Sequence, residues 1–274
     1  MKRLKPVLSA CLVAIGLLMA SGPALMNLFS TQKAAGDIEL VREQAAAVED
    51  GTLQEMLAQA ERWNAGLLGQ ASLNGQEDLW PYEQQLQVLD DGIMGILSIP
   101  RLDLRLPVYH GTGEEALSKG AGHLVSSSLP IGSASGRAVV SAHRGLMQAE
   151  LFTRLDEMEE GDLFVMETAG MTLAYRVHEI EVIRPDEVEA LAIEPGRDLM
   201  TLMTCTPYGI NDHRLLVHGE RTEWNETVKA ESEEQYEAPK MSLREMLFRL
   251  WPLALAILVG AVSLRAVLKK RKRV

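Results

Sequence analysis

Two long, largely apolar segments lie near the ends of the chain, on either side of a middle region in which polar and apolar positions mix. Pro6–Phe29 carries no charged side chain, and Met246–Leu268 carries only Arg249 and Arg265. At about 1.5 Å per helical residue, each segment can cross a hydrocarbon core of about 30 Å if the two arginines extend toward the interfaces. The pattern therefore predicts a membrane-spanning helix near each end.

Charge is distributed unevenly around these segments. Basic residues flank both on their outer sides, at Met1–Lys5 and Lys269–Arg273, whereas all 38 acidic residues lie between them. Because the cytosolic flanks of membrane helices are rich in Lys and Arg, we expect both ends in the cytosol and the acidic middle outside the cell. Two alternatives stay open: a cleaved signal peptide at the start, given the small residues Ala20-Ser21-Gly22, or a buried core helix at the end.

The composition is that of an ordinary globular protein, with 47% hydrophobic and 24% charged residues. It excludes a disordered, collagen-like or disulfide-scaffold protein, and the net charge of −11 argues against a nucleic-acid partner. In the predicted topology the two cysteines, Cys11 and Cys205, lie in different compartments and do not pair. One free thiol then stands in a non-reducing setting, which invites a chemical explanation.

The middle region begins with helical sequence and continues with short strands. Ile38–Leu68 is rich in helix formers, with an interruption at Asp50-Gly51 and a capping box at Thr52-Leu53-Gln54-Glu55 that is expected to restart the helix. Gly69–Asp91 is loop-like, and the acidic Glu223–Glu245 is expected to be a linker. Short β-branched or alternating runs between these segments predict a β-barrel or sandwich. The runs are Ile93–Ile99, Arg105–Tyr109, Arg137–His143, Leu163–Glu167, Met171–Ile183, Leu199–Cys205 and Arg214–Gly219.

Three chemically active side chains fall at the ends of predicted strands. Cys205 ends one strand, a Pro-Tyr-Gly-Ile-Asn-Asp loop follows, and Arg214 begins the next, while His143 ends a third. A thiol, an imidazole and a guanidinium can act as nucleophile, proton carrier and oxyanion donor. A nearby cation is needed, because a free thiol has a pKa of about 8.5. The alternative is a buried structural cysteine, a surface arginine and a solvated histidine.

These residues lie in a segment that resembles the sortases, the cysteine transpeptidases of Gram-positive surfaces. TLMTCTPYGINDHRLLVHGER (Thr201–Arg221) is similar to the family signature, and most similar to the class C, pilus-assembling branch. The resemblance extends, in the expected order, through GILSIPRLDLRLPVYHGT (Gly95–Thr112), GAGHLVSSSLP (Gly120–Pro130) and SAHRGL (Ser141–Leu146). It covers roughly Asp91–Arg221, and the two-anchor topology with a basic cytosolic tail also resembles class C.

The resemblance implies a mainly β protein, an eight-stranded sortase-type β-barrel with N-terminal helices and two flanking membrane-spanning helices. The matching positions imply a catalytic site of Cys205, His143 and Arg214. His123 is the main rival to His143, but it lies outside the His-Arg-Gly stretch. Thr204 and Ser141 would line the pocket as scaffold.

Class C sortases also resemble one another in a lid, a loop with an Asp-Pro-aromatic motif over the cysteine. The matching segment here is Asp78-Leu79-Trp80, in which Leu79 replaces the Pro. Asp78 would pair with Arg214, and the Trp80 ring would cover Cys205. The alternative is that Trp80 only fixes this loop to the barrel. No metal or other cofactor is implied, and His213 and His218 point to opposite faces of a strand, which is unsuited to a metal site.

The predicted organisation has five parts. Residues 1–36 form an N-terminal anchor or signal segment, 37–90 a helical lead-in with the lid loop, and 91–224 the catalytic barrel. Residues 225–245 form the acidic linker, and 246–274 form a transmembrane helix with a basic cytosolic tail.

The function implied by the resemblance is a membrane-anchored extracellular transpeptidase. It would cleave an LPXTG-like sorting signal, form a thioester acyl-enzyme and transfer it to an amine, by class resemblance a pilin lysine. The expected partners are LPXTG-bearing surface or pilin proteins and the membrane. The alternatives are attachment of proteins to the cell-wall peptide, hydrolysis, or a catalytically silent anchored scaffold barrel.

Overall fold

The computed structural model describes residues 15–16, 22, 33–45, 47–69, 78–87, 92–146, 149–237 and 255. The two segments predicted to span a membrane, Pro6–Phe29 and Met246–Leu268, lie outside these residues apart from isolated positions. Within the described ranges, no helix combines the length and the apolar character needed to cross a membrane. The elements below belong to one compact unit, Thr31–Leu146 together with Glu150–Ala238.

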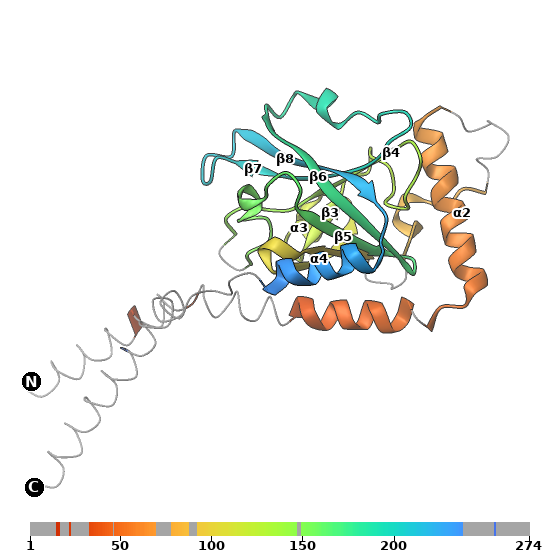
Figure 1. Cartoon of the computed structure of the whole chain (residues 1–274), viewed down its shortest axis with the longest axis horizontal. Helices are drawn as coiled ribbons and strands as arrows, with labels where there is room; N and C mark the ends of the chain where they lie inside the picture. The colour runs from red at the N-terminus through yellow and green to blue at the C-terminus, as the bar shows by residue number, and fades with distance from the viewer. Residues whose placement is uncertain are drawn as a thin grey trace, which may run out of the picture. The chain divides into compact units, whose positions relative to one another are not determined.

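Eight strands close into a barrel in the order β1-β2-β3-β4-β7-β8-β6-β5 (Figure 1). Neighbouring strands are antiparallel, except that β2 pairs with β3 and β4 with β7 in parallel. The strands are β1 (Ile93–Ile99), β2 (Leu104–His110), β3 (Ala121–His123), β4 (Gly136–Ser141), β5 (Leu163–Thr168), β6 (Met171–Ile183), β7 (Asp198–Thr206) and β8 (His213–Thr222). Closure leaves no unpaired sheet edge. The predicted mainly β, eight-stranded barrel is confirmed.

Short helices connect and cover these strands. The α-helices are α2 (Asp50–Leu67), α3 (Glu114–Leu117) and α4 (Glu226–Glu237). The 3₁₀ helices are η2 (Tyr82–Gln84), η3 (Pro100–Leu102), η4 (Leu155–Glu157) and η5 (Val188–Leu191). Residues 33–45 are also helical. N-terminal helices before a barrel are therefore present, as predicted.

The strand pattern was readable from the sequence except at β3. The predicted runs match β1 and β6 at both ends and the other strands to within a few residues. Strand β3 has only three residues, Ala121–His123, which are too few to display an alternation. It nevertheless closes the barrel, because it bridges β2 and β4.

Alternation along the strands separates the barrel interior from its outer surface. Phe164 and Tyr175 stack with ring centroids 5.5 Å apart, and both side chains are almost fully buried. Gly219 of β8 faces them, and a Cβ there would lie 2.5 Å from the Phe164 ring. Gly219 pairs with Met200 of β7, so Met200 and every second residue after it face the interior. The intervening residues of β7, which include Cys205, face outward.

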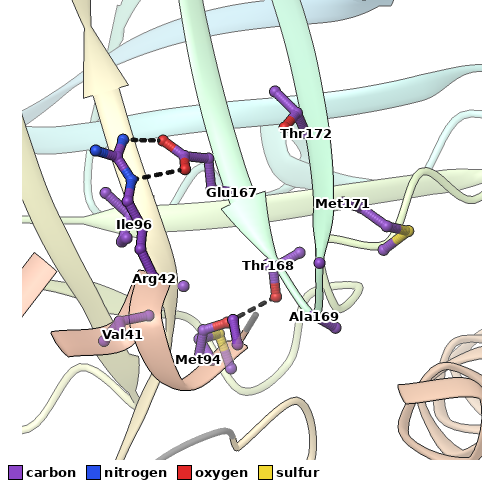
Figure 2. Close-up of a pocket in the computed structure, with 12 residues that line it drawn as sticks. Val41, Arg42, Met94, Ile96, Glu167, Thr168, Ala169, Met171 and Thr172 are labelled. Carbon is purple, nitrogen blue, oxygen red and sulfur yellow. Dashed lines mark hydrogen bonds and ion pairs between the residues drawn. The ribbon is translucent and has the colours of Figure 1, made fainter. Parts of the chain in front are cut away.

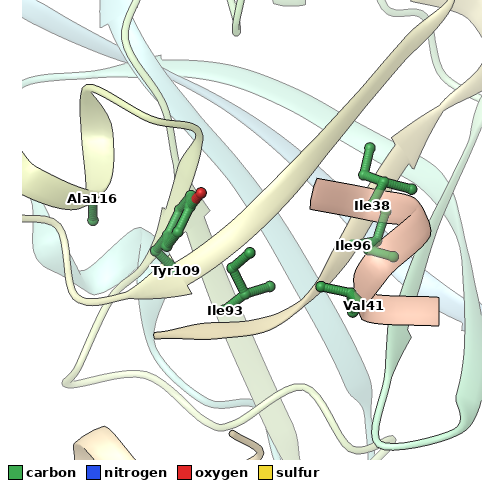
Figure 3. Packing of buried hydrophobic residues seen from close by; sticks show 6 residues of the cluster. All are labelled: Ile38, Val41, Ile93, Ile96, Tyr109 and Ala116. Carbon is green, nitrogen blue, oxygen red and sulfur yellow. The ribbon is translucent and has the colours of Figure 1, made fainter. Parts of the chain in front are cut away.

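The helix over residues 33–45 packs on the first strand. Figure 3 shows its Ile38 and Val41 beside Ile93 and Ile96 of β1, and all four belong to one buried cluster. Apolar residues three apart on a helix lie on one face, which explains how a largely polar helix docks here.

Helix α2 begins earlier than the capping box predicted. Its N-cap is Glu49, and the backbone N–H of Thr52 donates to the Glu49 carbonyl at 2.9 Å, inside the first turn. Asp50 in that turn is favoured by the helix dipole, and Gly51 is tolerated. The helix is fixed to the barrel by Asn64, whose side-chain amide donates to the Leu129 carbonyl at 3.0 Å.

The acidic segment expected to be a linker over 225–245 forms helix α4 over Glu226–Glu237. Val228 packs against Leu163, Val165 and Ala174 on the outer face of β5 and β6. Arg176 of β6 also makes two bonds to the Glu231 carboxylate, at 2.6 and 2.8 Å. The linker prediction is wrong for these residues, because specific contacts, among them this apolar contact and this bidentate ion pair, dock a helix whose average composition is polar.

Candidate active site

Cys205 and Arg214 lie side by side on two neighbouring strands, and His143 follows the end of the adjacent strand β4. Cys205 of β7 pairs directly with Arg214 of β8. On the other side of β7, Ser141 of β4 pairs in parallel with Met203. The pairing extends one residue further, because the Ala142 N–H donates to the Met203 carbonyl at 3.2 Å. His143 and Cys205 each follow this pair by two residues, so they stand at the same level. We call these three residues the strand-end row.

The strand-end row lies on the outer face of the barrel. Cys205 is neither fully buried nor fully exposed. Its neighbour Thr204 faces the interior with a 1% exposed side chain, and its hydroxyl donates to the Ala142 carbonyl at 2.8 Å. Thr204 therefore holds the backbone beside His143 and does not line an open pocket. Ser141 lies on the outer face and is partly buried.

Arg144 ties the two catalytic strands together, and the sequence alone did not reveal this. Its Nη1 donates to the Thr206 hydroxyl at 2.9 Å, and its Nη2 lies 2.5 Å from the Asp156 carboxylate. Arg144 directly follows His143, and Thr206 directly follows Cys205. The hydrogen bond between Arg144 and Thr206 therefore joins the two chain segments that carry His143 and Cys205. Its place in the His-Arg-Gly stretch was the only sequence signal, and spacing could not show which partner it has.

Arg214 is held at the end of the β7–β8 loop by backbone carbonyls. Its Nη1 donates to Asn211 at 3.2 Å and to His213 at 2.9 Å. A guanidinium has five N–H donors in a planar fork. Among the bonds that the structure records for described residues, these use only Nη1, so the rest of the fork can serve an oxyanion or a substrate carbonyl.

His123, the alternative histidine, is a buried structural residue. Its side chain is 0% exposed, its Nε2 donates to the Ser128 carbonyl at 2.9 Å, and its Nδ1 lies 2.9 Å from the Tyr82 hydroxyl. Burial lowers the pKa of His123 to about 4, and burial raises the pKa of Tyr82 to about 12. Both groups are therefore neutral at pH 7 and are sealed from substrate, which favours His143 as the proton carrier.

The candidate lid segment is fixed to helix α2. The side chain of Gln59 donates to the Asp78 carbonyl at 3.2 Å and accepts from the Trp80 N–H at 3.1 Å. The ion pairs recorded for the described residues include none between Asp78 and Arg214, whose guanidinium bonds to carbonyls of its own loop. Gln59 holds this loop through backbone atoms, so both alternatives stay predictions: covering of Cys205 by the Trp80 ring, and fixing of the loop to the barrel by Trp80.

A pocket of about 260 Å³ lies elsewhere on the barrel, between the helix over residues 33–45 and the β5–β6 hairpin. Figure 2 shows Arg42 reaching across to Glu167, with bonds of 3.0 and 2.6 Å. None of the residues that line it belongs to the strand-end row. The pocket is therefore separate from the candidate chemistry.

The fold and the strand-end row together define the class of protein: a closed β-barrel that carries a cysteine suited to act as a nucleophile. The particular family follows from comparison with known proteins. The chain belongs to the sortase family of cysteine transpeptidases, because the sortase domain model matches residues 97–222 and solved sortase structures align over nearly their whole length.

Three relatives illustrate the similarity. A lid mutant of Streptococcus agalactiae sortase C1 is 40% identical, with a TM-score of 0.63, and the match covers 69% of this chain and 99% of that one. Clostridium perfringens sortase C with its C-terminal cell wall sorting motif is 36% identical, with a TM-score of 0.60, covering 69% and 100%. Bacillus subtilis sortase D is 28% identical over 130 residues, covering 46% of this chain. The match spans only 63% of that curated relative's length.

Proposed function

We propose that this chain is a membrane-anchored extracellular transpeptidase that cleaves an LPXTG-like sorting signal and joins it to a pilin lysine. The observation that carries the proposal is the strand-end row, which brings a thiol, an imidazole and a guanidinium to one level on the accessible face of the barrel. Membership of the sortase family and similarity to the sortase C structures support the class of reaction and of substrate.

The proposed reaction has two halves. The Cys205 thiolate attacks the carbonyl carbon of the signal's threonine, and Arg214 stabilises the oxyanion of the tetrahedral intermediate. His143 gives a proton to the leaving amine of glycine as the C–N bond breaks, which leaves a thioester on Cys205. An incoming amine then attacks the thioester, His143 takes its proton, and a new amide forms as the thiolate is released.

The acceptor is tested by competition. The purified chain would be incubated with an LPXTG-like peptide, a lysine-bearing pilin peptide, and a peptide ending in the amine of a cell-wall stem. The proposal expects the lysine-linked product to dominate. A dominant cell-wall conjugate would make the chain a wall-attaching sortase, and release of free acid alone would make it a hydrolase. No turnover together with an inert Cys205 would contradict the whole assignment and favour a silent scaffold barrel.

The membrane part of the proposal rests on the sequence of the two ends. The largely apolar segments with basic outer flanks support two anchors whose tails are cytosolic and whose barrel is outside. In intact protoplasts, added protease is expected to digest the barrel and spare an epitope placed after Val274, with a cytosolic protein as the control for leakage. Loss of that epitope while the cytosolic control survives would reverse the orientation.

A further inference from the structure

A buried arginine stands on the same face of the barrel as Cys205, at some distance from it. Arg137 of β4 is only 4% exposed. Its Nη1 donates to the Thr201 hydroxyl at 3.1 Å and to His218 Nδ1 at 2.8 Å. Its Nε donates to the Ala192 carbonyl at 2.7 Å, and its Nη2 pairs with Glu194 at 2.5 Å. A buried charge with this many partners is costly to assemble, so its position calls for a role.

Two of these partners belong to the chain between β6 and β7, residues 184–197, which we call the covering segment. No residue of the covering segment is buried, and its helix η5 has no buried side chain. Hydrophobic packing therefore does not hold it on the barrel. Arg197 adds ion pairs with Glu194 and Glu220, but in these pairs both partners are partly exposed, so they contribute little. At its end, the segment is also bonded to the start of β4, through the Gly136 N–H to the Arg197 carbonyl at 3.1 Å and the Gly196 N–H to the Ser135 hydroxyl at 2.9 Å. The guanidinium of Arg137 is the buried side-chain attachment of its middle part, at Ala192 and Glu194.

Strand register relates this attachment to the strand-end row. Thr201 pairs with His218, the next outward pair is Met203 with Leu216, and the third is Cys205 with Arg214. Two residues along a strand span about 7 Å, so the Arg137 cluster lies about 13 Å from Cys205 on the same face. Four residues of extended peptide cover that distance. In an LPXTG-like signal, four residues precede the bond that is cleaved, so this part of the signal matches the distance between the Arg137 cluster and Cys205.

We propose that Arg137 is a positioning residue for the substrate: it holds the covering segment in place as the wall beside the sorting signal. This inference rests on the proposed function. Arg137 touches neither the reacting atoms nor the thiol. Its loss therefore loosens the wall and weakens substrate binding, while the chemistry at Cys205 is unchanged once substrate is bound.

The protonation of His218 is part of this attachment. A guanidinium only donates, so Nδ1 of His218 accepts from Arg137, and Nε2–H donates to Glu181 at 3.1 Å. Burial and the charge of Arg137 lower the pKa of His218, whereas Glu181 and Glu179 oppose this shift. His218 is thus held neutral, which keeps its Nδ1 lone pair on the guanidinium.

The experiment compares Arg137→Gln and Glu194→Gln with the wild type, using an LPXTG-like peptide. We expect KM to rise about tenfold and kcat to stay within about twofold, because one charged hydrogen bond at the wall is lost before the chemical step. Labelling of Cys205 by a small maleimide should proceed at the wild-type rate. The matched control is Arg176→Gln, which breaks the pair with Glu231 of α4 and should leave KM unchanged.

Two results would overturn the inference: an unchanged KM in Arg137→Gln, or a fall in kcat at constant KM. Glu194→Gln, altered at a partly exposed carboxylate, keeps the test valid if Arg137→Gln misfolds. If the wild type turns over no such peptide, the proposed function fails. The attachment of the covering segment is then tested by amide hydrogen exchange. Exchange in residues 184–197 should be about tenfold faster in Arg137→Gln and in Glu194→Gln than in the wild type, and unchanged in Arg176→Gln. Equal exchange rates in the variants and the wild type would contradict the inference that Arg137 holds the covering segment in place.

Discussion

Replacing Cys205 by Ala is expected to abolish transpeptidation and leave the barrel folded. Without the sulfur no thioester can form, and loss of a nucleophile typically costs about 10⁴-fold or more in kcat. Cys205 lies near the end of β7 and is only partly buried, so removing one atom leaves little cavity. The cost in the free energy of unfolding should be about 1 kcal/mol or less. Product formation and thermal unfolding, measured on the same preparation, separate the two effects.

The chain offers its own control for this substitution. Cys11, the other cysteine, falls in the N-terminal uncharged segment. Cys11→Ala should keep wild-type turnover and wild-type labelling of the remaining thiol by maleimide. Transpeptidation that persists in Cys205→Ala would remove the nucleophile assignment, and loss of turnover in both variants at once would point to a folding defect instead.

Replacing His143 by Ala is expected to lower kcat by about 10²–10⁴-fold, the usual worth of a positioned acid and base. The backbone of His143 is held by neighbours, since its carbonyl accepts from Phe152 and its side-chain loss breaks no recorded bond among the described residues. Stability should therefore change little.

The contrasting variant is His123→Asn. His123 is buried with both ring nitrogens bonded, so this change should lower the unfolding temperature and leave the pH dependence of kcat/KM in the surviving folded protein unchanged. If instead His123→Asn is folded but inactive and His143→Ala is active, the wrong histidine has been chosen.

The barrel could be foreseen because most of its strands show their alternation in the sequence. Residues of β7 and β8 alternate between the interior and the outer face of the barrel, and Pro195-Gly196 and Pro207 flank β7. Strand β3 is too short to carry such a pattern, and it is recruited by its neighbours. Helix α4 was missed for a related reason, because its docking depends on Val228 and Glu231 and not on its average polarity.

The three candidate site residues could be predicted because they sit in long motifs and near strand ends, and the structure makes two of them, Cys205 and Arg214, direct partners across β7 and β8; their catalytic roles stay predictions. The residues that hold the site in place were not foreseen. Arg144 and Arg137 act through partners far away in the chain, Thr206 and Glu194, and nothing in local spacing selects those partners. The lid stays a prediction: the motif located Asp78-Leu79-Trp80, and the described structure shows only that the Asp78 carbonyl accepts a hydrogen bond from Gln59.

A thioester between Cys205 and the sorting signal can be detected from the intact mass of the protein after incubation with an LPXTG-like peptide and no added amine. We expect an adduct equal to the peptide up to its threonine, located on Cys205 by digestion, released by hydroxylamine and absent from Cys205→Ala. Cleaved peptide without any adduct on Cys205, or an adduct on another residue, would contradict it.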